Sequence, residues 1–246
     1  MSLNHRATVS PLSRKLEQRD HLSAEEKRVL DQAVSRVKEV AAGEDILPEG
    51  ARPSDSTLLL DGFAGRYKVL ADGRRQITAI QVTGDFVDLH SFILKSLDHG
   101  VAALTRCKIA LVPHEALRQI TEQHPHLTRL LWLNTLIDAA IHREWIVAMG
   151  RRAALAQVAH LFCELYVRLR SVGLTNERSY HLPLTQAELG DTLGLSAVHV
   201  NRVIQELRSK GMITWRGNTL EITNWDALSE VAEFNPAYLY LADEPR

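Results

Sequence analysis

The side chains with the most definite chemistry lie in and just after the stretch LTQAELGDTLGLSAVHVNRVIQEL, at positions 184–207. Between residues 199 and 216 a single acid, Glu206, is outnumbered by four basic residues, which gives this segment a net charge of +3. The basic residues are Arg202, Arg208, Lys210 and Arg216. Ammonium and guanidinium groups gathered on one segment can contact phosphates, in an interaction that depends strongly on salt. The segment therefore predicts a local nucleic-acid interface on a chain whose overall net charge is only −1.

Two short helices are predicted within this stretch. Thr185 and Glu188 have the spacing of a capping box, so the first helix is expected to begin at Thr185. Gly194 can adopt the left-handed conformation that ends a helix, and Gly190 is small where a second helix would cross closely. Ser196 can cap that second helix. Its inner face would comprise Val200, Val203, Ile204 and Leu207.

Two helices that cross steeply at a glycine-bearing turn form a helix-turn-helix, and the residues that follow add a wing. Gly211 would end the second helix, and MITWRGNTLEIT at 212–223 has the pattern of a strand, a Gly217–Asn218 turn and another strand. The alternative is a helical hairpin in a protein-interaction domain, which would leave the basic face without a role. The pattern therefore favours a winged helix-turn-helix that binds DNA.

Base contacts are expected from the outward positions of the second helix. These are Ala197, Val198, His199, Asn201, Arg202 and Gln205. Arg202 is the strongest candidate because a guanidinium can bind guanine O6 and N7 together, whereas Val198 and Ala197 offer only methyl contacts. Asn201 can bind adenine or a phosphate. Contacts to the DNA backbone are expected from Thr185, Gln186, Ser196, Arg208, Lys210 and Arg216.

The rest of the chain is consistent with an intracellular protein. A hydrophobic fraction of 45% in 246 residues predicts a real core in one large or two modest domains. The two cysteines, Cys107 and Cys163, cannot form a disulfide framework, and we expect them to be packing residues. No uncharged apolar run approaches the roughly 18 residues that cross a bilayer, and the N-terminus lacks the apolar block of a signal peptide. We expect a soluble cytoplasmic protein with no membrane partner.

The N-terminal half is predicted to be mainly β-structure. Residues 1–20 are polar and basic and resemble a flexible arm. Ser23 can cap a short helix. Beyond it, turn signals recur about every 10 residues between β-branched and aromatic runs, which is typical of a sandwich or barrel over residues 21–120. The turn signals are Asp61–Gly62, Gly65, Asp72–Gly73 and Gly84–Asp85.

A long helix is predicted at 124–150, with two largely apolar faces at 3–4 spacing. The first stripe comprises Leu127, Leu130, Asn134, Ile137, Ile141, Glu144 and Ala148, and the second Leu133, Leu136, Ala140, Arg143 and Val147. One face can cover the β-domain, and the other needs a partner. We predict a homodimer seam formed by Leu130, Asn134, Ile137, Ile141 and Ala148. The alternative is a helix buried within a single core.

These features resemble the Crp/Fnr family of bacterial transcription regulators. The resemblance rests on the glycine-punctuated β-segment ending in GDFVDL, the long helix, GRRAALAQVAHLFCEL and LTQAELGDTLGLSAVHVNRVIQELRSKGMI. It implies an α+β protein with an N-terminal β jelly-roll (cyclic-nucleotide-binding-like) domain, a long dimerisation helix and a C-terminal winged helix-turn-helix. The last would span 151–223, with a C-terminal tail at 224–246. It also implies a two-fold operator in double-stranded DNA and contact with RNA polymerase. Arg202 matches the family's base-reading arginine, whereas Val198 replaces a glutamate found in many members.

The expected effector pocket departs from that of the cyclic-nucleotide-binding members. Gly84 and Asp85 match the start of the family's nucleotide cassette, which also contains an arginine for the buried cyclic phosphate. No arginine occurs between Arg75 and Arg106 here. The pocket candidates are Gly84, Asp85, Asp88 and Lys95. We therefore do not expect cAMP to bind.

Other cofactors and activities have little support in the sequence. An iron–sulfur cluster of the family's oxygen sensors needs four cysteine ligands, and the chain has two cysteines. Histidines for an axial haem ligand exist but are scattered, so haem is not expected. No metal site is predicted. The enzyme motifs HExxH, CxxC and GxSxG are missing, as is a phosphate-binding glycine loop, so we do not predict an enzyme. The remaining alternative is a small-molecule- or haem-binding sensor or interaction module without its own DNA target.

Overall fold

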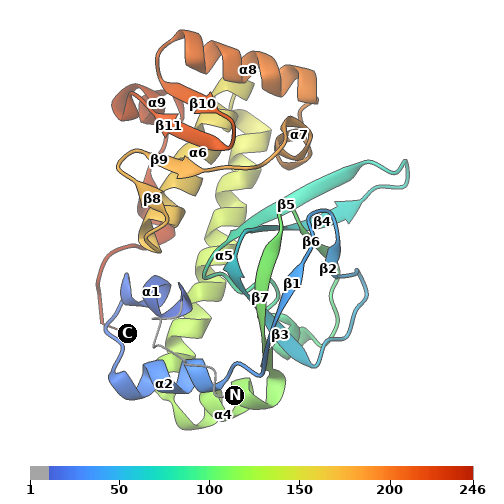
Figure 1. Ribbon diagram of the computed structural model, residues 1–246, viewed down its shortest axis with the longest axis vertical. Coiled ribbons are helices and arrows are strands. Elements are labelled where there is room, and N and C mark those ends of the chain that lie inside the picture. The colour runs from blue at the N-terminus through green and yellow to red at the C-terminus, as the bar shows by residue number, and fades with distance from the viewer. Residues whose placement is uncertain (1–10, 246) are drawn as a thin grey trace, which may run out of the picture.

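Residues 11–245 are described by a computed structural model in which a β-roll and a C-terminal domain lie on either side of a long helix (Figure 1). The chain begins with α1 (Pro11–Glu17) and α2 (Ala24–Gln32). Ser23 caps α2, and its hydroxyl accepts a hydrogen bond from the amide of Glu26, as the cap prediction requires. The prediction of a flexible arm is wrong for α1, because Leu12 and Leu16 are only 3% and 2% exposed. Residues 1–10 of that arm lie outside the described residues.

The β-roll consists of two antiparallel sheets. The first has the order β1 (Arg36–Val40), β7 (Cys107–Pro113) and β3 (Asp55–Asp61). The second has the order β2 (Asp45–Leu47), β6 (Gly100–Ala103), β4 (Phe63–Val69) and β5 (Arg75–Val82). A short helix, α3 (Ser91–Leu94), follows β5, and both sheets bury apolar side chains in a shared core. The predicted jelly-roll is thus confirmed.

Three of the four predicted turn signals correspond to backbone turns. Gly62, Gly73 and Gly84 have φ values of +96°, +83° and +90°, which favour glycine. Gly65 is an exception, because it lies inside β4 and not in a turn. A Cβ atom at that position would lie 3.1 Å from the side chain of Leu104, so close packing explains this glycine.

The long helix is α5 (Pro125–Arg151), preceded by α4 (His114–Gln123). Its predicted dimer stripe is wrong, because that face packs inside the chain. The exposed fractions of Leu130, Asn134, Ile137, Ile141 and Ala148 are 0%, 8%, 3%, 7% and 5%. Both stripes have the same 3–4 spacing, so periodicity could not decide which one covers the β-roll.

The opposite face of α5 remains uncovered. Trp132, Leu136, Ile146 and Val147 are 66%, 52%, 66% and 46% exposed. Leu136 and Val147 belong to the second predicted stripe, whereas Ala140 of that stripe is buried. The helix therefore has one apolar face inside the chain and one apolar face toward solvent.

The C-terminal domain begins with α6 (Ala154–Ser171), which is almost wholly buried and runs beside α5 (Figure 1). A sheet of order β10–β11–β9–β8 and three further helices follow. The elements are β8 (Thr175–Asn176), β9 (Ser179–His181), α7 (Gln186–Leu193), α8 (Ala197–Ser209), β10 (Ile213–Arg216), β11 (Thr219–Ile222) and α9 (Trp225–Val231). The predicted tail thus contains α9 and the 3₁₀ helix η1 (Pro236–Leu239), which contacts α5 and α6.

The two cysteines are free and buried, as predicted for packing residues. The Cys107 thiol donates a hydrogen bond to the carbonyl of Phe63 at 3.2 Å. Burial raises the pKa of both thiols, that of Cys163 to about 12. No helix in the described part of the chain is long and apolar enough to span a membrane.

Candidate nucleic-acid interface and sensor junction

The turn between α7 and α8 is built by local contacts. The hydroxyl of Thr185 accepts a hydrogen bond from the Glu188 amide at 3.1 Å, and the Glu188 carboxylate accepts one from the Thr185 amide at 2.7 Å. Gly194 ends α7 with a φ of +67°. A Cβ atom on Gly190 would lie 2.5 Å from the carbonyl oxygen of Leu195, so only glycine permits this close crossing. The predicted helix-turn-helix is confirmed.

One face of α8 is buried and the other is open to solvent. The predicted inner residues Val200, Val203, Ile204 and Leu207 are at most 4% exposed. The predicted base-reading residues Ala197, Val198, His199, Arg202 and Gln205 are exposed, and Asn201 is half-buried. The amide of Asn201 donates a hydrogen bond to the side-chain oxygen of Gln186 at 3.0 Å, which links the two helices. The structure therefore brings the predicted base-reading side chains onto one free face.

The predicted phosphate-contacting residues lie at the ends of α7 and α8 and in the wing. Thr185, Gln186 and Ser196 are exposed at the starts of α7 and α8. Arg208 and Lys210 lie at the end of α8, and Arg216 ends β10 of the wing, a strand that contacts α8. Within residues 11–245, Lys210 pairs loosely with Glu206 at 3.7 Å, and no carboxylate pairs with Arg202, Arg208 or Arg216. These basic groups are thus available to an external anion.

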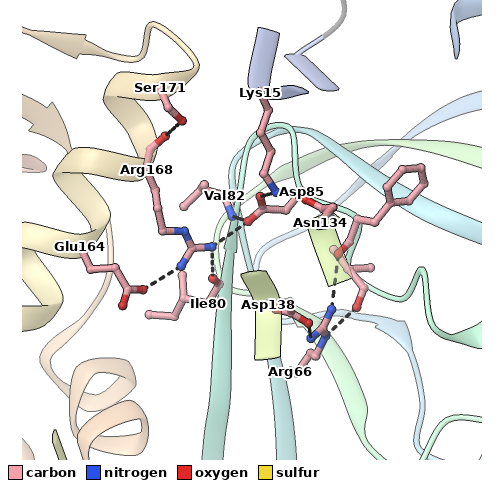
Figure 2. Close-up of polar contacts among 12 residues, drawn as sticks. Lys15, Arg66, Ile80, Val82, Asp85, Asn134, Asp138, Glu164, Arg168 and Ser171 are labelled. Carbon is pink, nitrogen blue, oxygen red and sulfur yellow. Dashed lines mark hydrogen bonds and ion pairs between the residues drawn. The ribbon is translucent and has the colours of Figure 1, made fainter. Parts of the chain in front are cut away.

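A different arrangement occurs where the β-roll meets α6, a region called the junction from here on. Figure 2 shows the Asp85 carboxylate between Lys15 of α1 and Arg168 of α6. Its Oδ1 is 2.6 Å from Lys15 Nζ, and its Oδ2 is 2.7 Å from Arg168 Nη2. The Val82 amide also donates to Oδ2 at 2.9 Å. Burial by itself would raise the pKa of Asp85, but the Lys15 and Arg168 charges hold it at about 2. Asp85 is therefore ionised at neutral pH.

Arg168 extends this junction into the C-terminal domain. Its guanidinium donates to the Ile80 carbonyl at 2.7 Å and to the Glu164 carboxylate at 3.0 Å. Glu164 is completely buried, and it also accepts hydrogen bonds from Trp145 Nε1 at 3.1 Å and the Tyr238 hydroxyl at 2.8 Å. Four elements, from the β-roll to η1, thus share one buried polar network.

A second ion pair closes the contact between the roll and α5. Arg66 of β4 is 6% exposed, and it pairs with Asp138 of α5 and donates to the Val87 carbonyl at 2.7 Å (Figure 2). Beside both ion pairs lies a cavity of about 40 Å³, whose lining includes Lys15, Arg66 and Asp85. This volume has room for a few water molecules at most.

Of the four predicted pocket residues, only Asp85 lines this cavity. Asp88 is buried, and its carboxylate accepts hydrogen bonds from the Thr57 amide at 2.5 Å and the Ser91 hydroxyl at 3.1 Å. Burial raises its pKa to about 6. Lys95 is exposed at the end of α3, and its ammonium group donates to the Phe92 carbonyl. The four residues therefore do not form one pocket.

Three cations of the junction, Lys15, Arg66 and Arg168, could not be predicted from the sequence. Arg168 lies four residues after Glu164, and that spacing on a helix is the one sequence signal for a pair. Lys15 and Asp85 are 70 residues apart, and no local pattern joins them. In the described part of the chain, no group of three or more metal-ligating side chains lies together.

Comparisons with known proteins agree with this geometry. Residues 37–124 match the cyclic nucleotide-binding domain, and residues 156–231 match the Crp-like helix-turn-helix domain. A probable transcriptional activator of Rhizobium leguminosarum bv. viciae is 32% identical over 176 residues, which cover 72% of each chain. The chain belongs to the Crp/Fnr family. Members of this family are transcription regulators that bind DNA through the helix-turn-helix, and they are not enzymes.

Other similar proteins point to the same family. The transcriptional activator protein FnrL of Cereibacter sphaeroides is 25% identical to this Crp/Fnr regulator over 213 residues, which cover 85% of each chain. The structure of FixK2 from Bradyrhizobium japonicum has a TM-score of 0.73 and 25% identity, and the match covers 80% of this chain and 97% of FixK2. A c-di-GMP responsive regulator, CLP of Xanthomonas campestris, has a TM-score of 0.62 at 14% identity, which shows the shared fold.

Proposed function

We propose that this Crp/Fnr regulator is a cytoplasmic homodimer that binds a two-fold operator through α8. Bound to the operator, the dimer would contact RNA polymerase. In this proposal residues 21–120 are the sensor, 124–150 the dimerisation helix and 151–223 the DNA-binding domain. The observation that carries it is the free outward face of α8, where Arg202 is exposed without a carboxylate partner among the described residues. A helix with such a face fits the major groove of DNA.

The operator preference follows from the side chains on this face. Arg202 would bind guanine, and Asn201 would bind adenine with its free carbonyl oxygen and remaining amide hydrogen, because Gln186 already accepts the other. Val198 is 65% exposed and can contact only an apolar group such as a thymine methyl. The operator would therefore differ from one that is read through a glutamate at position 198.

The solvent-facing stripe of α5 supports the dimer. Its members are Trp132, Leu136, Ala139, Arg143 and Ile146, which follow one another at alternating spacings of four and three residues. That spacing forms a continuous seam between two helices, and large exposed apolar side chains along it favour a second copy of the chain. We propose this stripe as the dimer seam in place of the buried one.

The β-roll is proposed to work without cAMP. Arg66 and Asp138 pair across the contact between roll and helix, and the remaining cavity of about 40 Å³ is too small for a nucleotide. Operator binding measured with and without cAMP tests this point, and tighter binding in the presence of cAMP would contradict it.

The test of the whole proposal uses random duplex DNA. Retained duplexes are sequenced after several rounds of selection, and the result we expect is an inverted repeat with one guanine contact per half-site. Native mass spectrometry of the wild type, Leu136→Glu and the matched control Val37→Glu tests the seam. We expect a monomer only for Leu136→Glu, because Val37 is a 47% exposed residue of β1 outside the seam. Selection without an enriched motif would refute the proposed operator.

A further inference from the structure

The ammonium group of Lys15 is held by acceptors from two other elements of the fold. Its Nζ is 2.6 Å from Asp85 Oδ1, on the turn after β5, and 2.5 Å from Asn134 Oδ1, on α5 (Figure 2). We propose that Asp85 and Asn134 form a binding site for a primary ammonium group, that Lys15 of the chain's own α1 occupies it, and that this occupancy attaches α6 to the β-roll. The effect of this occupancy on DNA binding rests on the proposed function.

The site has the chemistry that selects an ammonium group. Asp85 supplies a carboxylate and Asn134 a neutral carbonyl oxygen, and an ammonium has three N–H donors and no acceptor. The side chains of Lys15 and Asp85 are only 14% and 8% exposed, so the pair is largely shielded from water. Burial lowers the pKa of Lys15, while the charge of Asp85 opposes that shift. An empty site would leave Asp85 with Arg168 as its remaining cationic partner.

The rest of α1 delivers the ammonium group to this site. Leu12 and Leu16 pack into a buried cluster with residues of α2, the roll and α5. Gly84 makes room for the backbone of α1, because a Cβ atom there would lie 2.9 Å from the Pro11 carbonyl oxygen. A seven-residue helix does not form alone in water. The helix of α1 and the occupancy of the site therefore depend on each other.

The second carboxylate oxygen of Asp85 links the ammonium site to the DNA-binding domain. Oδ2 binds Arg168 of α6, while Oδ1 binds Lys15, so both cations fix one carboxylate. Arg168 also binds Glu164, and α6 packs directly on α8 in one hydrophobic core. Loss of the ammonium group would free one side of Asp85 and loosen α6 from the roll. The orientation of α8 would then be less fixed before DNA binds.

The experiment is chemical rescue in the full-length protein. Lys15→Ala removes the side chain beyond Cβ, and n-propylammonium has the shape of the missing part. We expect the thermal midpoint of Lys15→Ala to fall by roughly 5–15 °C, because one partner of a buried ion pair is lost. Millimolar n-propylammonium chloride should restore part of that fall. Tetramethylammonium, which has no N–H donor, should not.

The matched control is Lys68→Ala. Lys68 is 42% exposed and pairs with Glu49 on the surface, so its loss should change the midpoint little and n-propylammonium should not act selectively on it. Equal effects of n-propylammonium on both variants, or no rescue of Lys15→Ala, would overturn the ammonium site. If Lys15→Ala does not fold, Asn134→Leu removes one acceptor. Hydrogen exchange at residues 11–17 should then become at least tenfold faster, and unchanged exchange would overturn the site.

Operator binding separates this inference from the proposed function. With the selected duplex, we expect Lys15→Ala to bind at least about fivefold more weakly than the wild type, within the usual range of coupling between sites, and n-propylammonium to restore affinity. Rescue of the thermal midpoint without any change in DNA affinity would refute the coupling to α6. If the wild type selects no DNA motif, the proposed operator is refuted instead. Rescue of the thermal midpoint of Lys15→Ala by n-propylammonium still tests the ammonium site in that case.

Discussion

The outward face of α8 and the junction around Asp85 are both rich in charge, but the partners of those charges lie in different places. On α8, Arg202 is exposed and has no carboxylate partner among residues 11–245. At the junction, Lys15 and Arg168 share one carboxylate that is 8% exposed. Charges left without partners on a surface serve an external molecule, whereas charges paired in the interior fix elements of the chain to one another.

This difference determines what a substitution should change. Removal of a surface cation costs the fold little, so its effect should appear in DNA binding. Removal of one member of a buried pair leaves an uncompensated charge, so its effect should appear first in stability. The following variants test that division, from the largest expected effect to the smallest.

The junction predicts the largest loss of stability for Asp85→Asn. The variant leaves Lys15 and Arg168 as buried cations without their shared carboxylate, which we expect to lower the free energy of unfolding by about 3–5 kcal/mol. Urea denaturation followed by circular dichroism measures the change. Asp72→Asn is the control, because Asp72 pairs with Arg74 on the surface. A loss below about 1 kcal/mol would mean that the junction stabilises the fold no more than an ordinary surface ion pair does.

Asp88 predicts a pH dependence of stability. Burial raises its folded pKa to about 6 from an ordinary 3.8, so the neutral carboxyl is favoured in the fold. Its contribution is fully present below about pH 4 and is lost as the pH rises through 6. Asp88→Asn stays neutral, so it should gain roughly 3 kcal/mol relative to the wild type between pH 4 and pH 7. Parallel stability profiles of the two proteins over that range would show that Asp88 has an ordinary pKa.

On the DNA-binding face, Arg202→Ala should weaken operator binding by about 1–3 kcal/mol and relax specificity at one base pair per half-site. Titrations on the selected operator and on duplexes mutated at single positions measure both effects. The midpoint of thermal unfolding should stay at the wild-type value, because Arg202 is exposed. An unchanged preference at every base pair would remove Arg202 from the base-reading set.

The smallest effect is expected for Arg216→Ala in the wing. A lost phosphate contact should weaken binding to all sequences alike and reduce the slope of log affinity against log salt by about 1 per site. Binding isotherms at several salt concentrations, on operator and on random DNA, provide the comparison. A loss confined to the operator would mean that Arg216 contacts a base.

The same division explains what the sequence could predict. The helix-turn-helix depends on local signals, namely the capping box from Thr185 to Glu188 and the left-handed Gly194, and these were predicted correctly. The junction joins Lys15 to Asp85 across 70 residues and Arg168 to Asp85 across 83, which only tertiary structure brings together. Local signals fix local geometry, but they do not specify a buried pair between distant segments.

The long helix is an intermediate case. Its length and its two apolar stripes could be predicted from the spacing of apolar residues. The assignment of the first stripe to a dimer seam was wrong, because Leu130 and Leu136 lie on faces of equal periodicity and the choice depends on the shape of the β-roll. The burial of Leu12 and Leu16 in α1 could not be predicted either, because the residues around them are mostly polar and basic.

The two enclosed cysteines have a practical consequence. Cys107 and Cys163 are 1% and 0% exposed, and burial raises the pKa of both thiols, so neither offers a reactive thiolate to reagents in solution. A thiol introduced by Ser209→Cys, at the exposed end of α8 and outside the predicted DNA contacts, would therefore be labelled selectively. One fluorophore or spin label per protomer would then report the separation of the two recognition helices, with and without DNA. The native cysteines would add no signal, because their buried thiols would not be labelled.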